Sequence, residues 1–322
     1  TTTYGIGARD ILVVKFAQDF SILWQKTIGT TADEYVFDRE SSFENTDGTI
    51  MIIGNSSSGL IGGDDMLLLK LSSVGNFLWS KVYGGGSDER GMTVEKCLDG
   101  GYILGGNTYS YPNGKNNIYL VKVDSLGNSN WNWSFGNTQK TATQVTDIVS
   151  LADSSYIFSG IYDGSPSNGN SFIGRVDKNG LLLWINRYTF SNNFGWEGIN
   201  GLALGNNYVI ANGVTRGFLQ HGGLSDGIVM SLDFNGSINW SKVYGGVGDD
   251  WLYKVDIDNQ QNISSVVYTS SVGFGSFDMG LLKLNSLGNV LAYNVFGSSG
   301  VEHAKFFSNT ADGGAIVSGS TT

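Results

Sequence analysis

Short apolar runs alternate along this chain with short segments rich in Gly, Asn, Asp and Ser. In the best-preserved stretch, the apolar runs cover residues 66–72, 77–83, 89–97 and 102–106. Runs of this length bounded by turn-forming residues are typical of β-strands. The Asn-Gly pairs at 179–180 and 235–236 mark tight hairpins between strands. No window of about 12 residues shows the 3.6-residue period of an amphipathic helix. We therefore predict an all-β chain built from four-stranded units.

The four-strand unit recurs six times, and one aromatic residue marks the same place in each copy. These anchor residues are Trp24, Trp79, Trp131, Trp184, Trp240 and Tyr293. Successive anchors are 55, 52, 53, 56 and 53 residues apart, and a period of about 50 residues in a β-rich chain indicates propeller blades. A packing contact between blades must recur once per blade, so we expect the anchors to be structural. Residues 1–322 are predicted to form a single domain, a six-bladed β-propeller of four-stranded antiparallel blades.

The chain begins and ends inside a blade. With the strands of a blade lettered a to d from the central axis to the rim, residues 10–17 and 21–27 match c and d strands that have no a or b before them. Residues 301–308 and 314–319 match a and b strands that have no c or d after them. We predict that the N-terminal c and d strands pair with the C-terminal a and b strands, which removes the exposed edges of an open sheet. The alternative is that the terminal strands complete a neighbouring molecule and drive self-assembly.

The best-preserved copy carries a dense motif. Its residues are Asp65, Lys70, Gly75, Asn76, Trp79, Tyr83, Gly84, Gly85, Asp88, Glu89, Asp99, Gly100, Tyr102, Gly105 and Thr108. The motif resembles the repeat of the SBBP-type β-propeller proteins of bacteria and archaea, and the similarity extends over all six copies. Two copies depart from it, since Phe135-Gly136-Asn137 replaces the Gly-Gly pair in the third and residues 188–195 lack that pair in the fourth. The resemblance implies a propeller that is secreted or displayed on a cell surface, and it brings no catalytic residues to transfer.

Composition narrows the classes of partner. The net charge of −10 and the isoelectric point near 4.6 disfavour nucleic acid and anionic membranes. No apolar run reaches the roughly 18 residues of a membrane span, so we expect a protein that does not span a membrane. Cys97 is the only cysteine, so no disulfide can form within the chain and a buried thiol is expected. Abundant Ser, Thr, Asn and Gly with few Lys residues also favours an extracellular or cell-surface location.

An acidic residue stands at the start of the a strand in five of the six copies. The five residues are Glu34, Glu89, Glu197, Asp250 and Glu302. The simplest interpretation is that each accepts backbone N–H bonds and fixes the turn from the d strand to the next a strand. The alternative is a ring of carboxylates around one mouth of the axial channel, which would attract cations or bind sugar hydroxyls. A Ca²⁺ site would need six to eight converging oxygens, so no metal or cofactor is predicted and Ca²⁺ is kept only as an alternative.

Aromatic and basic residues adjoin these acids. The candidate ligand contacts are Glu34, Glu89, Arg90, Trp196, Glu197, Asp250, Trp251, Glu302 and His303. An aromatic face covers the C–H groups of a sugar while carboxylates bind its hydroxyls, so the pattern suits a carbohydrate site. Packing between blades is the other interpretation of the aromatics. The most variable loops open on the same face, as binding loops on a rigid scaffold do; they cover residues 55–64, 107–116, 161–170, 214–225 and 270–277.

We expect a non-catalytic binding or scaffold module whose partner is a glycan or another surface protein. One alternative is an enzyme that acts on polysaccharide through carboxylates at the channel mouth. A second is a structural subunit of a surface layer or filament. His221 and His303 are the only histidines and have no metal-ligand spacing, and no G-x-S-x-G or P-loop motif occurs.

Overall fold

The computed structural model describes residues 8–19, 21–37, 41–59, 61–110, 116–136, 143–163, 169–188, 197–216, 225–310 and 314–321. Every regular element in these ranges is a β-strand, and no helix there is long and apolar enough to cross a membrane. The element order is that of a six-bladed β-propeller, as the sequence predicts. The chain divides into two compact units, residues 1–145 and 146–322, which we call unit 1 and unit 2.

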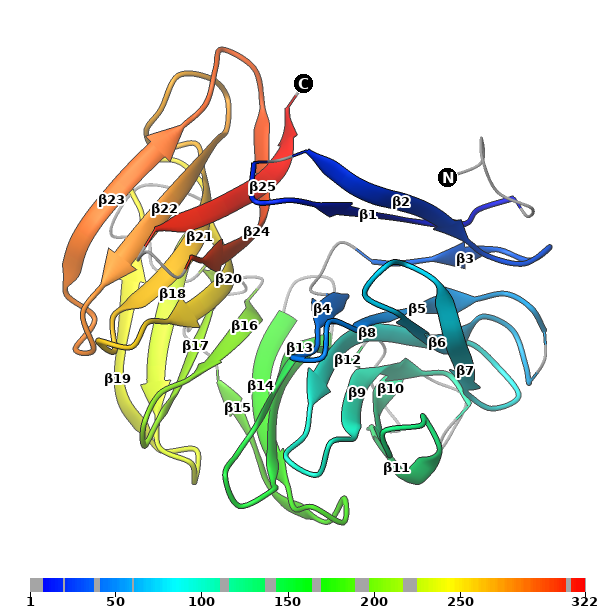
Figure 1. The fold of residues 1–322 in the computed structure, drawn as a ribbon. Helices are drawn as coiled ribbons and strands as arrows, with labels where there is room; N and C mark the ends of the chain where they lie inside the picture. Colours follow the sequence, from blue (N-terminus) through cyan, green and yellow to red (C-terminus); the bar gives the residue numbers. More distant parts are fainter. Residues whose placement is uncertain are drawn as a thin grey trace. The chain divides into compact units, whose positions relative to one another are not determined.

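Unit 1 contains one half-blade and two blades (Figure 1). The half-blade pairs β1 (Ile11–Phe16) with β2 (Ile22–Ile28). In the first blade the a strand is broken into two short pieces that both pair with the b strand; the strands are β3 (Glu34–Tyr35), β4 (Ser42–Glu44), β5 (Ile50–Ser56), β6 (Asp65–Leu71) and β7 (Phe77–Tyr83). The second blade consists of β8 (Glu89–Lys96), β9 (Tyr102–Thr108), β10 (Asn117–Val123) and β11 (Ser129–Phe135).

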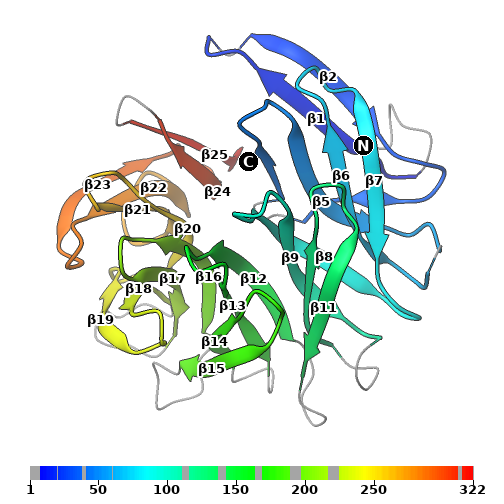
Figure 2. The same ribbon diagram turned by 60° about the horizontal axis from the view of Figure 1, so that its bottom comes forward.

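Unit 2 contains three blades and the other half-blade, and the first of its strands begins just before the division. The third blade consists of β12 (Thr143–Ser150), β13 (Tyr156–Asp163), β14 (Gly169–Val176) and β15 (Leu182–Tyr188). The fourth consists of β16 (Gly198–Leu204), β17 (Val209–Thr215), β18 (Asp226–Leu232) and β19 (Ile238–Tyr244). The fifth consists of β20 (Asp250–Ile257), β21 (Ile263–Thr269), β22 (Asp278–Leu284) and β23 (Val290–Phe296). Figure 2 shows these last four strands side by side in chain order.

Each end of the chain contributes one pair of strands. β24 (Glu302–Asn309) and β25 (Ala315–Thr321) pair with each other in unit 2, and β1 and β2 pair with each other in unit 1. In the described residues the two pairs are separate sheets, so their assembly into one closed blade stays a prediction.

Burial follows strand position in the first, second, fourth and fifth blades, whereas most residues of β25, the b strand of the C-terminal half-blade, are exposed. The b strands β5, β9, β17 and β21 are buried along their whole length, whereas most residues of the d strands β2, β7 and β23 are exposed. All six c strands shift register against their d strand between their last two residues, a bulge that the repeat copies into every blade. The core of each unit therefore consists of apolar side chains packed between consecutive sheets.

The anchor tryptophans pack against the c-to-d hairpin of the following blade. Trp24 Nε1 donates to the Ser73 carbonyl at 3.1 Å, and Trp240 Nε1 donates to the Ser286 carbonyl at 3.2 Å. Each indole covers a glycine with positive φ, a conformation that favours Gly because it has no Cβ; a Cβ on Gly75 would lie 2.7 Å from the Trp24 ring. The structural interpretation is confirmed for Trp24, Trp79, Trp184 and Trp240.

The sixth anchor, Tyr293, was assigned wrongly by the spacing of aromatics. Trp240 lies four residues after Gly236, and the residue four after Gly288 is Ala292. The ladder agrees, because Ala292 pairs with Lys283, just before the bulge, as Trp240 pairs with Ser231. Tyr293 therefore points to the opposite side of β23 from the anchors, since successive side chains of a strand alternate.

Candidate functional site

The five predicted acids lie at or just before the first residue of an a strand. Glu34 begins β3, Glu89 begins β8, Asp250 begins β20 and Glu302 begins β24, while Glu197 immediately precedes β16. None of the five is more than 4% exposed. Buried carboxylates need compensating hydrogen bonds, so their partners decide what these acids do.

The carboxylates hold the turn from the d strand to the a strand. In four blades an N–H four residues earlier donates to the acid: Thr30 to Glu34 at 2.7 Å, Gly85 to Glu89 at 2.5 Å, Gly246 to Asp250 at 2.8 Å and Ser298 to Glu302 at 2.9 Å. A hydroxyl at or near the end of the neighbouring b strand donates as well, from Ser56, Thr108, Ser271 and Thr321 respectively. The hydrogen bonds from the Ser298 hydroxyl and N–H, followed by that from Thr321, hold the pKa of Glu302 below its usual value.

The backbone of each of these four acids also joins one blade to the next. The N–H of Glu34 donates to the Arg9 carbonyl at 2.8 Å, and the N–H of Glu89 donates to the Asp64 carbonyl at 2.6 Å. In unit 2, Asp250 donates to the Ser225 carbonyl at 2.8 Å and Glu302 to the Phe277 carbonyl at 2.9 Å. The acceptor in each case lies just before or at the start of a c strand of the preceding blade. These residues thus form a structural junction repeated from blade to blade.

A second acid faces the first across the glycine that follows each d strand. These partners begin or just precede c strands, and they are Asp10, Asp65, Asp226 and Asp278. A Cβ on Gly297 would lie 1.8 Å from Asp278 Oδ1 and 2.6 Å from Glu302 Oε2, and the other three junctions are alike. The Asp278 Oδ2 atom accepts N–H bonds from Phe274 at 3.0 Å and Gly275 at 3.2 Å, so it fixes the b-to-c loop. These residues are not among the site residues predicted from the sequence, although the motif of the repeat begins with one of them, Asp65.

Burial of two carboxyls side by side disfavours the charged form of at least one of them. Burial raises the pKa of Asp65 to about 6, and the Glu89 charge adds to this rise. Within the described ranges no group of three or more His, Cys, Asp or Glu side chains is placed to hold a metal ion.

Aromatic rings gather in unit 2 beside Asp250 and Glu302. We call the set Trp251, Tyr253, Tyr268, Phe277 and His303 the aromatic platform. The Tyr268 ring stacks on both Phe277, with centroids 4.3 Å apart, and His303, with centroids 4.7 Å apart. The Trp251 ring lies edge-on to Tyr268, with centroids 6.1 Å apart, and its centroid lies 6.3 Å from that of Tyr253. Tyr268 is buried and the other four are half-buried. The structure therefore joins two of the predicted ligand contacts, Trp251 and His303, through a tyrosine that the sequence analysis did not single out.

In unit 1 the corresponding positions carry cations beside tyrosines. The Arg9 guanidinium lies 4.5 Å from the Tyr35 ring centroid and pairs with Asp33 at 2.8 Å. The Tyr35 hydroxyl donates to Asp64 at 2.8 Å; burial, followed by this hydrogen bond, raises the pKa of Tyr35 to about 12. The Arg90 guanidinium lies 5.9 Å from the Tyr109 ring centroid.

The predicted site is thus divided between the two units. Glu34, Glu89 and Arg90 belong to unit 1, and Glu197, Asp250, Trp251, Glu302 and His303 belong to unit 2. Trp196 lies outside the described residues. A single mouth that all of these residues share stays a prediction.

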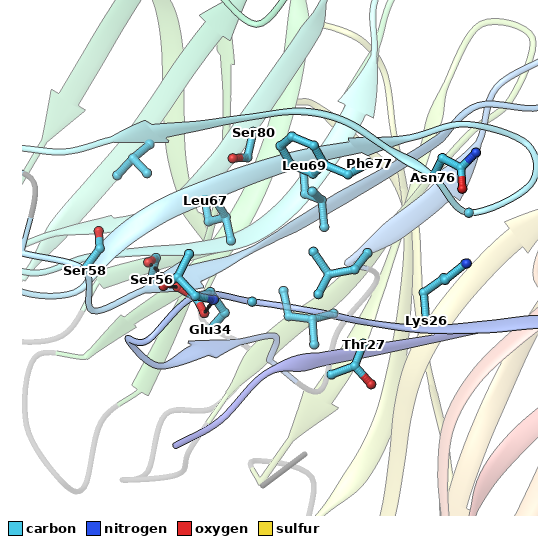
Figure 3. A pocket seen from close by; sticks show the side chains of 16 residues that line it. Lys26, Thr27, Glu34, Ser56, Ser58, Leu67, Leu69, Asn76, Phe77 and Ser80 are labelled. Carbon is cyan, nitrogen blue, oxygen red and sulfur yellow. Dashed lines mark hydrogen bonds between the residues drawn. The ribbon is translucent and has the colours of Figure 1, made fainter. Parts of the chain in front are cut away.

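Two pockets lie beside the acids, each between a d strand and the next blade of the same unit. The larger, of about 580 Å³, runs from Glu34, Ser56 and Ser58 at one end to Lys26 and Asn76 at the other, with Leu67, Leu69 and Phe77 along its wall (Figure 3). The smaller, of about 330 Å³, lies between β19 and the fifth blade and includes Asp250, Ser271 and Tyr293. Both occupy equivalent places in the repeat.

No protein-family model and no curated protein matches this chain. Among solved structures, the chain is similar to a gluconolactonase from Xanthomonas campestris, with a TM-score of 0.47 and 11% identity over 90% of this chain and 87% of that chain. It is also similar to a neuraminidase-like protein of A/little yellow-shouldered bat/Guatemala, with a TM-score of 0.47 and 10% identity over 84% of this chain and 87% of that chain. Similarity at this level transfers no activity.

Proposed function

We propose that the protein is a non-catalytic binding module that acts outside the cell or on its surface, and that the aromatic platform of unit 2 binds a carbohydrate. The observation that carries this proposal is the continuous contact of Trp251, Tyr268 and His303 beside two buried acids. Half-buried ring faces suit the C–H face of a sugar, and the ring nitrogens of His303 suit its hydroxyls.

The use of the carboxylates supports binding in preference to hydrolysis. A glycosidase needs two carboxyl groups that face the scissile bond from opposite sides. Here the oxygens of Asp250 and Glu302 accept hydrogen bonds from Gly246, Ser271, Ser298 and Thr321, which fix turns of the fold. A structural subunit of a surface layer would use the same fold without a ligand, and it would self-associate where the binding module stays monomeric.

A glycan array probed with the purified protein, followed by calorimetry on the best oligosaccharide, tests the proposal. Trp251→Ala should weaken binding at least about tenfold, as loss of an aromatic anchor does, while the melting temperature changes little. The matched control is Trp133→Ala in unit 1, a half-buried tryptophan whose ring stacks on Phe135 with centroids 5.6 Å apart. This control should bind the oligosaccharide like the wild type.

The acids should behave in the opposite way. Glu302→Gln keeps the shape of the side chain but weakens its bonds to Ser298 and Thr321, so it should lower the melting temperature and leave the affinity unchanged. An array without any bound glycan, or a Trp251→Ala variant that binds normally, would overturn the carbohydrate proposal. Release of reducing ends from the bound glycan would instead favour the enzyme.

A further inference from the structure

Tyrosines at the ends of d strands fill the junctions between blades. The Tyr83 hydroxyl donates to the Gly127 carbonyl at 2.7 Å, that of Tyr188 to the Gly236 carbonyl at 2.8 Å, and that of Tyr244 to the Gly288 carbonyl at 2.7 Å. Each ring thus reaches from the d strand of one blade to the c-to-d turn of the next. Tyr83 is only 8% exposed and packs in the core cluster of unit 1. The phenol ring and its hydroxyl are therefore a recurring part of the junction.

At the junction between β2 and the first blade, this tyrosine is replaced by Ile28. The register shows the equivalence, because Ile28 pairs with Ile11 just as Tyr83 pairs with Met66, one residue after the acid of the c strand. Isoleucine is shorter than tyrosine and has no hydroxyl. The turn glycine here is Gly75, whose φ of 77° matches those of its counterparts. Among the described residues, no side chain donates to its carbonyl.

The larger pocket lies where the missing tyrosine would be. Ile28 and Gly75 both line it, together with Leu67 and Leu69 of the c strand β6. In the next blade, Tyr83 packs in one cluster with the equivalent c-strand residues Tyr119 and Val121. At the β19 junction Tyr244 is present, and the equivalent pocket is smaller, about 330 Å³ against 580 Å³. The fourth residue of the d strand also differs between the two pockets. It is Tyr293 in the smaller pocket and the much smaller Ser80 in the larger one, so Tyr293 reduces the volume of the second pocket further. Loss of a large side chain from a packed site leaves a cavity that an apolar ligand can enter.

We propose that the pocket between β2 and the first blade binds a small phenol. The ring lies between Ile28 and the wall formed by Leu67 and Leu69, and the hydroxyl donates to the Gly75 carbonyl. Gly75 is buried, and a hydroxyl donor would give its carbonyl the hydrogen bond that tyrosine supplies at the other three turns. A substituent para to the hydroxyl points along the pocket toward the end where Figure 3 shows Glu34 and Ser56.

Calorimetric or NMR titration with 4-ethylphenol tests the proposal, with 4-ethylanisole as a control of similar shape that lacks the donor. We expect one saturable site for the phenol and binding of the ether about tenfold weaker, the effect of one hydrogen bond. Equal affinity for both probes, or no saturable binding of the phenol, would overturn the proposal.

Two reciprocal variants localise the site. Ile28→Tyr introduces the side chain found at the junctions of Tyr83, Tyr188 and Tyr244, so it should abolish phenol binding and raise the melting temperature. Tyr83→Ile reproduces the pocket at the next junction of the same unit, so it should raise the stoichiometry from one to two. A folded Ile28→Tyr variant with wild-type affinity contradicts the proposal, as does a folded Tyr83→Ile variant that still binds one equivalent. Neither variant touches the aromatic platform, so these results are independent of carbohydrate binding.

Discussion

Asp65 and Glu89 hold their carboxyl groups on the two sides of Gly84, so close that one added carbon would touch both. A Cβ on Gly84 would lie 2.0 Å from Asp65 Oδ1 and 2.5 Å from Glu89 Oε2. Both acids are fully buried. Gly84 does not have a positive φ, so the glycine is required by the carboxylates beside it and not by its backbone conformation. Gly29, Gly245 and Gly297 stand between equivalent pairs of acids.

Gly84→Ala should therefore destabilise the protein strongly. The added methyl group must displace two buried carboxylates that fix turns, and overpacking of this kind costs about 1–3 kcal/mol or more. The matched control is Gly86→Ala two residues later, where an added Cβ meets nothing within 4 Å and stability should change by less than about 0.5 kcal/mol. Urea unfolding of the two variants measures the difference. Equal stabilities would show that the carboxylates move aside freely.

Asp65 should make the stability of the protein fall as the pH rises from about 4 to about 6. Its pKa is raised to about 6 in the folded state, first by burial and then by Glu89, against about 3.9 when unfolded. Between these values the folded state binds more protons than the unfolded state, so raising the pH lowers the free energy of unfolding. Asp65→Asn has no proton to lose. The difference in free energy of unfolding between Asp65→Asn and wild type should therefore be about 2 kcal/mol more favourable to the variant at pH 7 than at pH 4.

The control for this pH dependence is an acid shifted the other way. The hydrogen bonds from Ser21 lower the pKa of the exposed Asp19, so Asp19 stabilises the folded state above its unfolded pKa and this contribution is lost as the pH falls. Asp19→Asn should thus change the pH slope in the opposite sense to Asp65→Asn. Urea unfolding at both pH values measures the two slopes, and parallel slopes for wild type and Asp65→Asn would contradict the assignment.

If the two ends of the chain close the sixth blade, as the sequence predicts, the folding of each end should depend on the other. Deletion of residues 1–28 removes β1 and β2 together with the Trp24 bond to Ser73. It should produce aggregation or a large loss of stability, because it leaves strand edges unpaired. A circular permutant that joins residue 322 to residue 1 and opens the chain between Asp99 and Gly100 keeps every strand and should stay monomeric. A truncated chain that remains monomeric with an unchanged melting temperature would refute closure, and light scattering of both proteins decides the matter.

The sequence predicts the strands well because their signals are local. Residues 77–83 match β7, and the turn glycines and the acids at the start of a strands were found by counting along the repeat. Glu34, Glu89, Asp250 and Glu302 do fix turns, the simplest interpretation of their position.

What the sequence does not predict depends on neighbours from other blades. Asp65 and Glu89 are 24 residues apart, and only the packing of two sheets brings them together. The bond from Tyr83 to Gly127 spans 44 residues, so the replacement of this tyrosine by Ile28 has no visible meaning in the sequence alone. Tyr293 is wrongly predicted as an anchor because the spacing of aromatic residues does not fix strand register, which follows the distance from the turn glycine.

The tryptophan and tyrosine side chains that join consecutive blades all reach toward the blade that follows in the chain. Trp24, Trp184 and Trp240, and Tyr83, Tyr188 and Tyr244, each reach from the end of one repeat into the hairpin of the next. In these repeats the last strand thus carries an aromatic side chain that fits the hairpin of the repeat that follows. A duplicated repeat of this type would bring both the aromatic side chain and the hairpin with it, so a gene encoding this chain can lengthen by duplication without a new interface between blades.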